Sequence, residues 1–106
     1  IGGATAKTML IRAIGPTLAG FGVPRVVSDP KIELFDQGGN SLAANDNWGG
    51  AAALATAFAD TGAFALNAGS ADAALLATLA PGNYTAQVTV ATGVTGVALV
   101  EAYDVP

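Results

Sequence analysis

The segment from Asp29 to Trp48, DPKIELFDQGGNSLAANDNW, constrains the fold most, because it has two short strand-like stretches on either side of a glycine-rich turn. In the first stretch Ile32 and Leu34 occupy alternate positions, which is typical of a strand with one buried face. The turn, Asp36–Asn40, supplies the glycine and Asx residues that adopt positive φ in tight reversals. We therefore predict a β-hairpin over about Lys31–Ala44.

The hairpin leads into a polar corner, Asn45-Asp46-Asn47, which is the densest cluster of oxygen ligands in the sequence. One interpretation is structural: Asn45 and Asp46 hydrogen-bond the backbone of a tight corner, and Asn47 caps a helix that begins after Gly50. The other interpretation is a bound cation. Calcium takes about six to eight oxygen ligands, usually with several carboxylates, so the structural interpretation is favoured.

Further strand-like segments lie on both sides of the hairpin. Lys7–Ile14 is largely apolar at odd and even positions, which predicts a strand covered on both faces. Gly15-Pro16 ends it, and we expect Leu18, Phe21 and Val23 of the following loop to pack onto the core. Three later strand-like segments are separated by glycine and proline turns: Ala73–Leu79, Asn83–Val90 and Val97–Tyr103.

One short helix is expected, from Ala51 to about Asp60. This segment is rich in alanine, places Leu54 and Phe58 four residues apart on one face, and is followed by Gly62. Short strands with one helix predict an all-β fold, an antiparallel β-sandwich or jelly roll with one short helical insertion. A chain of 106 residues is expected to form a single domain, residues 1–106. Because it starts at Ile1 rather than methionine, we interpret it as a mature or excised segment.

Charge is scarce in this chain. Charged residues make up 11% of the sequence and hydrophobic residues 52%, whereas an ordinary soluble domain has about 25% charged residues. Alanine, glycine and threonine must therefore occupy much of the surface. A weakly polar, nearly uncharged surface is the kind that packs against other protein.

Composition also argues against several functional classes. The four basic residues, Lys7, Arg12, Arg25 and Lys31, form no patch suited to a phosphate backbone, so nucleic acid is not an expected partner. No segment approaches the roughly 18 consecutive apolar residues of a membrane helix, so membrane insertion is not expected either. The sequence contains no histidine and no cysteine, which removes the usual catalytic triads, dyads and zinc ligands. We expect no catalytic residues and no enzymatic activity.

Five stretches of the sequence resemble a known type of module: LIRAIGPTLAGFGV, DPKIELFD, NDNWGG, LAPGNYTAQV and GVALVEAYDV. The pattern is similar to the bacterial pre-peptidase C-terminal domain, a β-sandwich, and more closely to a module found in tandem copies in large exported bacterial proteins. The second similarity covers nearly the whole chain. It implies a bacterial, extracellular or cell-surface module that is non-catalytic and architectural.

The same resemblance implies a cation site. In some pre-peptidase-type relatives, acidic and Asx residues around the second strand bind calcium, and the matching positions here are Asp36, Asn45, Asp46 and Asn47. This corner has two amides flanking a single aspartate, where the more acidic version has further carboxylates. No cofactor other than calcium is expected.

The segment Ile1–Ile14 suggests how copies of the chain would associate. It leads almost directly into the apolar strand Lys7–Ile14, and the low charge provides no device against edge-to-edge pairing. We therefore expect a self-associating structural module, a filament subunit or a link in a tandem array, in which Ile1–Ile14 or Val97–Val105 adds to a neighbour's sheet. The expected interface residues are Met9, Leu10, Ile11, Ile14, Val97 and Leu99.

The alternative is a binding module rather than a polymer. In that interpretation a calcium-assisted corner around Asn45–Trp48 presents its loops to a glycan or a matrix protein. It predicts a monomer with a ligand, whereas the structural interpretation predicts large assemblies of this chain with itself.

Overall fold

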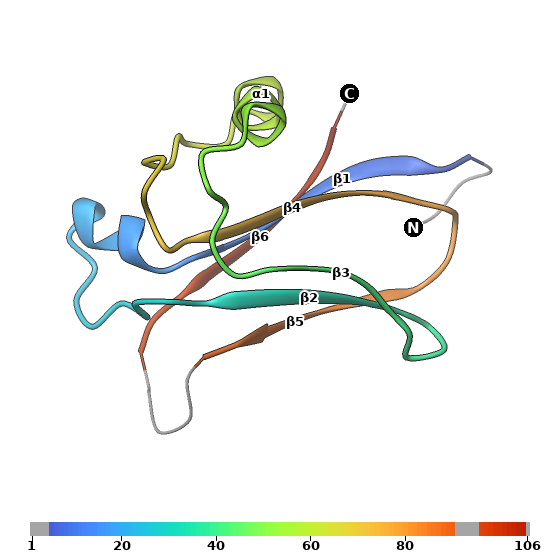
Figure 1. The fold of residues 1–106 in the computed structure, drawn as a ribbon, viewed down its shortest axis with the longest axis horizontal. Coiled ribbons are helices and arrows are strands. Elements are labelled where there is room, and N and C mark those ends of the chain that lie inside the picture. The colour runs from blue at the N-terminus through green and yellow to red at the C-terminus, as the bar shows by residue number, and fades with distance from the viewer. Residues whose placement is uncertain (1–4, 91–95, 106) are drawn as a thin grey trace.

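The computed structural model describes residues 5–90 and 96–105 and consists of two stacked three-stranded antiparallel sheets with one α-helix outside them (Figure 1). This is the predicted all-β sandwich with one short helix. The elements in chain order are β1 (Lys7–Ile14), the 3-10 helix η1 (Pro16–Phe21), β2 (Lys31–Asp36), β3 (Ser41–Asn45), α1 (Ala52–Thr61), β4 (Ala73–Leu79), β5 (Tyr84–Thr89) and β6 (Leu99–Asp104).

The first sheet has the strand order β4-β1-β6, so β1 is its central strand. Ile11 of β1 lies opposite Leu75 of β4 and Ala102 of β6. Side chains of β1 are buried on both faces from Leu10 to Ile14, as the apolar residues at both parities predict.

The second sheet has the order β3-β2-β5 and contains the predicted hairpin. The reversal between β2 and β3 is closed by a hydrogen bond of 3.0 Å from the Gly39 amide to the Asp36 carbonyl, and Gly39 has a φ of +83°. A register shift between Leu34 and Phe35 places a bulge in the pairing of β2 with β3. The bulge bends β3, which is an edge strand of this sheet.

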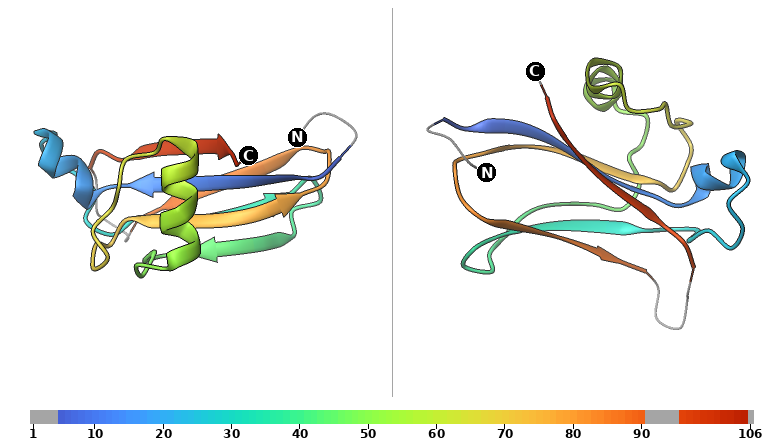
Figure 2. Two further views of the ribbon diagram at one scale, coloured as in Figure 1. Left: turned by 90° about the horizontal axis from the view of Figure 1, so that it is seen from above. Right: turned by 180° about the vertical axis from the view of Figure 1, so that it is seen from behind.

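The apolar core has two layers. One lies between the sheets and is formed by Ile11, Ala13, Ile32, Leu34, Ala73, Leu75 and Leu79. The other lies on the opposite face of the first sheet, beneath α1, and is formed by Leu10, Ile14, Leu18, Trp48, Ala57, Phe58, Leu66 and Ala74. Figure 2 (left) shows α1 crossing the strands of this sheet. The outer face of the second sheet has no such cover in the described part of the chain.

The helix α1 begins one residue later than predicted and ends at Thr61, and the following residue, Gly62, adopts the left-handed conformation with a φ of +77°. Its alanines supply helix propensity, and Ala57 and Phe58 are buried against the first sheet. The residue before the first turn is Ala51, and no side chain caps the helix. The prediction that Asn47 caps it is therefore wrong. Within the described ranges, no helix is long and apolar enough to cross a bilayer.

The loop after β1 forms η1, which is anchored by the buried carboxylate of Asp72. Its Oδ1 accepts hydrogen bonds from the Gly15 amide (2.8 Å) and the Thr17 amide (3.2 Å), and its Oδ2 accepts one from the Thr17 hydroxyl. Leu18 is buried as predicted. Phe21 is 64% exposed, so the expectation that it packs onto the core is wrong.

The two sides of the sandwich differ. On the side of β3 and β4 the sheets are joined by hydrogen bonds from the Ala74 amide to Asn45 Oδ1 (3.1 Å) and from the Trp48 amide to the Asp72 carbonyl (3.0 Å). On the side of β5 and β6, seen from the front in Figure 2 (right), Ala86 and Ala102 remain exposed although they face the space between the sheets. The sandwich is closed on one side and open on the other.

Candidate functional site

The predicted cation ligands do not converge. Ile32 pairs with Asn45 at one end of the β2–β3 hairpin, and Asp36 lies at the other end, in the turn. There its Oδ1 accepts a hydrogen bond of 2.9 Å from the Asn40 amide, and the side-chain amide of Asn40 donates to both carboxylate oxygens. These bonds lower the pKa of Asp36 below its ordinary value. Asp36 is therefore a turn residue and does not join the Asn45–Asn47 corner.

Asn45 holds the corner together through both ends of its side-chain amide. Its Nδ2 donates to the Asn47 carbonyl (3.1 Å), while its Oδ1 accepts the amide proton of Ala74 in the other sheet (3.1 Å). This is the structural role that the sequence favoured for Asn45. The described residues contain no cluster of three or more acidic, histidine or cysteine side chains able to hold a metal ion.

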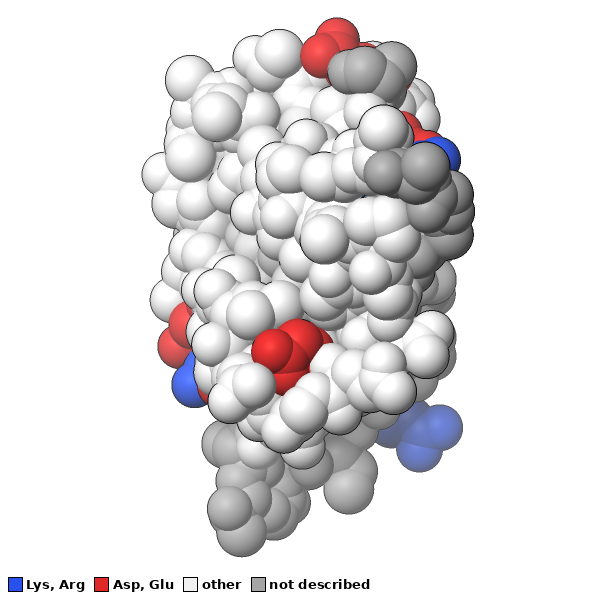
Figure 3. All heavy atoms as spheres, turned by 90° about the vertical axis from the view of Figure 1, so that its right-hand side faces the viewer, with Lys and Arg blue, Asp and Glu red and all other residues white. Residues whose placement is uncertain are grey.

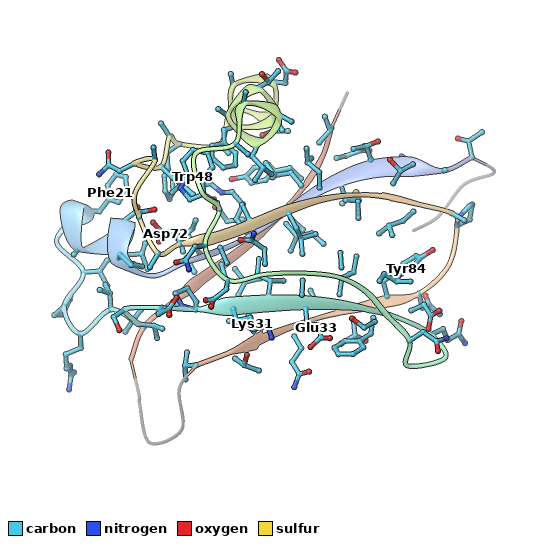
Figure 4. The ribbon with its side chains drawn as sticks, viewed as in Figure 1. Phe21, Lys31, Glu33, Trp48, Asp72 and Tyr84 are labelled. Carbon is cyan, nitrogen blue, oxygen red and sulfur yellow. The ribbon has the colours of Figure 1, made fainter. Side chains whose placement is uncertain are left out.

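Trp48 follows the corner and is buried beneath α1, close to the anchoring residue Asp72 (Figure 4). Its indole Nε1 donates to the Asn67 carbonyl at 2.9 Å, and its ring centroid lies 5.1 Å from that of Phe58. The aromatic face is therefore part of the core and does not offer a stacking surface for a sugar.

A pair of carboxylates that the sequence interpretation missed lies beside the corner. The pKa of Asp29 is raised above its ordinary value, first by a hydrogen bond with Asp46, then by slight desolvation and by repulsion between the two carboxylates, although both side chains are exposed. Together with Lys31, Thr89 and Val90 they line an open cleft of about 290 Å³. The signal was present in the sequence, since residues just before β2 and just after β3 must lie at the same end of an antiparallel hairpin.

Another buried charge stabilises the first sheet. Arg12 of β1 has no exposed surface and lies between the rings of Phe58 and Phe64, with its guanidinium carbon 4.7 Å and 4.5 Å from the two ring centroids. Its Nη2 lies 2.7 Å from Oε1 of Glu101 on β6, and its Nη1 donates to the Phe64 carbonyl at 2.7 Å. The Arg12 guanidinium is therefore inaccessible to a ligand from solvent, and its role is structural.

The predicted interface residues separate into two groups. Leu10, Ile11 and Ile14 are buried in this chain's own core, and Met9 packs against it. Because β1 is paired on both edges, Lys7–Ile14 has no free edge in this structure for pairing with a neighbour's sheet. Residues 1–4 of the proposed exchange segment lie outside the described residues. Val97 and Leu99, by contrast, are 47% and 39% exposed.

The exposed sheet edges carry very little charge. Figure 3 shows charged side chains as isolated spots on one end of a mostly uncharged surface. Three of the four edge strands, β3 (SLAAN), β4 (AALLATL) and β5 (YTAQVT), contain no charged residue. The central strands β1 and β2 instead carry Lys7, Arg12, Lys31, Glu33 and Asp36. Figure 4 shows Lys31 and Glu33 projecting from the outer face of β2.

The remaining edge strand, β6, has two acids that are both paired with basic residues of β1. Glu101 pairs with Arg12 and accepts a hydrogen bond of 2.5 Å from the Tyr103 hydroxyl, which raises the pKa of Tyr103. Asp104 lies 3.2 Å from the ammonium of Lys7. Charged edge residues usually prevent sheets from joining, and these two acids are neutralised within the sheet.

An apolar cleft opens on the same side of the sandwich. Its volume is about 240 Å³, and its lining residues are Met9, Ile11, Leu34, Leu79, Tyr84, Ala86 and Ala102. Near it, Val100 of β6 is 52% exposed, although it lies opposite the buried Ala13 and faces the space between the sheets. The side chains of β6 that face the space between the sheets are thus left largely uncovered.

Comparisons with known protein families, curated proteins and solved structures give no match for this chain. The function is therefore inferred from the geometry of the sheets and from the chemistry of their edges.

Proposed function

We propose that this chain is a non-catalytic structural module that associates with other copies by pairing sheet edges, as a filament subunit or as one link of a tandem array. The observation that carries the proposal is the distribution of charge among the strands. Soluble β proteins usually protect edge strands with lysine, proline or inward-pointing charges. Here the charges without an ion-pair partner lie on the central strand β2, three of the four edge strands carry no charge, and the two acids of the fourth, β6, are paired with bases of β1.

An extracellular or cell-surface location in a bacterium fits this proposal. It is supported by the resemblance of segments such as DPKIELFD and LAPGNYTAQV to modules repeated in large exported proteins. A module repeated along a chain brings neutral edges of neighbouring copies to a high effective concentration, so even weak edge pairing becomes significant.

The alternative, a calcium-assisted module that binds a glycan or a matrix protein through the Asn45–Trp48 corner, has less support. Asn45 uses its amide within the corner, Trp48 is buried, and Asp36 lies at the far end of the hairpin. Titrating the chain with calcium by calorimetry separates the two ideas, because the structural module is expected to release no binding heat.

Size-exclusion chromatography with light scattering, followed by negative-stain electron microscopy, tests the proposal. We expect a mass that rises with protein concentration, and extended assemblies at the highest concentrations. In the variant Gln87→Lys/Val100→Lys, which adds one charge to the edge strand of each sheet on the open side of the sandwich, we expect a smaller mass. The control Thr56→Lys/Ala59→Lys adds the same two charges to the exposed face of α1 and should leave assembly unchanged. A chain that stays monomeric at every concentration overturns the proposal.

A further inference from the structure

The four sheet edges are not equally available to a partner. The amide of Ala74 on the outer edge of β4 already donates to Asn45 across the closed side of the sandwich. The β3 edge is distorted by the bulge opposite Leu34 and Phe35, and bulges are a common way to terminate strand pairing. These two edges lie on the closed side. The edges of β5 and β6 lie on the open side.

Of the two edges on the open side, β6 would bury more exposed apolar surface if a partner covered it. Its residues Leu99 and Val100 are 39% and 52% exposed, and Val97 just before it is 47% exposed. The side chains of β5 on its outer face are Thr85, Gln87 and Thr89, which lose little by remaining in water. Burial of apolar area is the main favourable term in association, so it favours the β6 edge.

We propose that the first contact between copies is an antiparallel pairing of β6 with β6 of a second copy, around a two-fold axis perpendicular to the first sheet. This inference rests on the proposed function and names the strand and the partner. Pairing a strand with its own copy is an isologous contact, in which the same surface serves both sides. The result is a continuous sheet of order β4-β1-β6-β6-β1-β4.

Two features of β6 make a second copy a suitable partner. Its acids Glu101 and Asp104 are held by Arg12 and Lys7 of their own sheet, so two β6 strands meet without a net repulsion of free carboxylates. A two-fold axis perpendicular to the sheet also keeps like faces together. Val100 and Ala102 of both copies then face the space between the sheets. The open sides of the two sandwiches meet there and enclose this space together.

The symmetry also restricts the register. Placing Glu101 on the two-fold axis sets like charges directly opposite each other, which is unfavourable in a strand pair. Placing Val100 on the axis sets the most exposed valine of β6 against its own copy and brings Leu99 opposite Glu101. We therefore assign Val100 to the axis. An interface of standard size buries about 800 Å² on each partner, which is about one seventh of the 5689 Å² surface of the chain.

The test compares two exposed apolar residues that lie on different edges. In Val100→Lys we expect association to weaken by at least about tenfold in light scattering, because pairing would bury an uncompensated ammonium. In the control Leu42→Lys, which changes a 47% exposed residue of β3, association should remain as in the parent chain. Fluorescence of the single tryptophan, Trp48, reports whether each variant is folded.

Cysteine substitution tests the same contact without adding charge. Since the chain has no cysteine, Val100→Cys is expected to give a disulfide-linked dimer on mild oxidation, whereas Leu42→Cys is expected to stay monomeric in denaturing electrophoresis. If Leu42→Lys weakens association and Val100→Lys does not, β6 is the wrong edge although the proposed function stands. If the parent chain never associates, the proposed function and this inference both fail.

Discussion

Arg12 and Glu101 form an ion pair with 2.7 Å between Nη2 and Oε1, and the Arg12 side chain has no exposed surface. The pair joins the central strand β1 to the edge strand β6 across the face that α1 covers. A second pair, Lys7 with Asp104, joins the same strands at 3.2 Å but is exposed to solvent. One strand pairing thus contains a buried and an exposed ion pair, which can be compared directly.

We predict that Glu101→Gln lowers the free energy of unfolding by about 3 kcal/mol, because it leaves the buried Arg12 guanidinium without a counter-charge. Urea denaturation followed by Trp48 fluorescence measures the change. The matched control Asp104→Asn removes the exposed pair and is expected to cost no more than about 0.5 kcal/mol. Equal losses in the two variants would contradict the assigned burial of Arg12.

A second prediction concerns the anchor of η1. Replacing Asp72 with asparagine keeps its size but turns one of its two acceptor oxygens into a donor that faces existing donors. We expect a loss of about 2 kcal/mol, since up to three hydrogen bonds from Gly15 and Thr17 are weakened. Hydrogen exchange of the Gly15 and Thr17 amides should accelerate as well. Thr17→Val, which removes only the hydroxyl donor, should cost about half as much.

The third prediction concerns the close packing at the end of β1. A methyl group at Gly15 would lie 2.0 Å from the Val27 carbonyl oxygen, so Gly15→Ala requires the backbone to move. We expect a loss of about 3 kcal/mol in urea denaturation. Gly20→Ala is the control, because a methyl group there meets nothing within 4 Å. A small loss of stability in Gly15→Ala would mean that the loop carrying Val27 can move at little energetic cost.

The strands themselves could be predicted because their signals are local. Ile32 and Leu34 alternate with exposed neighbours, and Lys7–Ile14 is apolar at both parities, so each pattern follows directly from the side-chain period of a strand. The bounds of β1 and β4 agree with the predicted segments, and the turn at Gly39 lies where its sequence indicated.

The arrangement of the strands could not be predicted in the same way. That β1 is central follows from its pairing with β4 and β6, whose paired residues are 60–72 and 85–95 positions away in the sequence. Pairing between such distant segments depends on the whole sheet. For this reason the sequence interpretation placed Leu10 and Ile14 in an interface, whereas they belong to the core.

The predicted cation ligands do not come together, and the reason is related. Asp36 and Asp46 flank the same hairpin, but one lies in its turn and the other beyond its open end. Counting oxygen ligands along the sequence ignores this separation. The register instead places Asp46 beside Asp29, since both lie at the open end of the hairpin.

That pair gives a prediction with a definite dependence on pH. The native pKa of Asp29 is raised because its carboxyl group shares a hydrogen bond with Asp46. A raised native pKa means that the folded state binds the proton more tightly than the unfolded state. The favourable contribution of the pair is therefore fully present below the ordinary pKa of 3.8, and it is lost as the pH rises through the higher native value. At neutral pH the two carboxylates repel each other.

We therefore expect Asp29→Asn to raise the free energy of unfolding at pH 7 and to give no gain near pH 3. Because both carboxylates are exposed and screened by solvent, the gain should be no more than about 0.5 kcal/mol. Urea denaturation at the two pH values, followed by Trp48 fluorescence, measures it. Asp36→Asn is a control of opposite sign: the lowered pKa of Asp36 means that its carboxylate stabilises the fold at pH 7 and loses this effect as the pH falls through that lowered value. If Asp29→Asn is destabilising at pH 7, the hydrogen bond between the two side chains outweighs their repulsion, and the predicted sign is wrong.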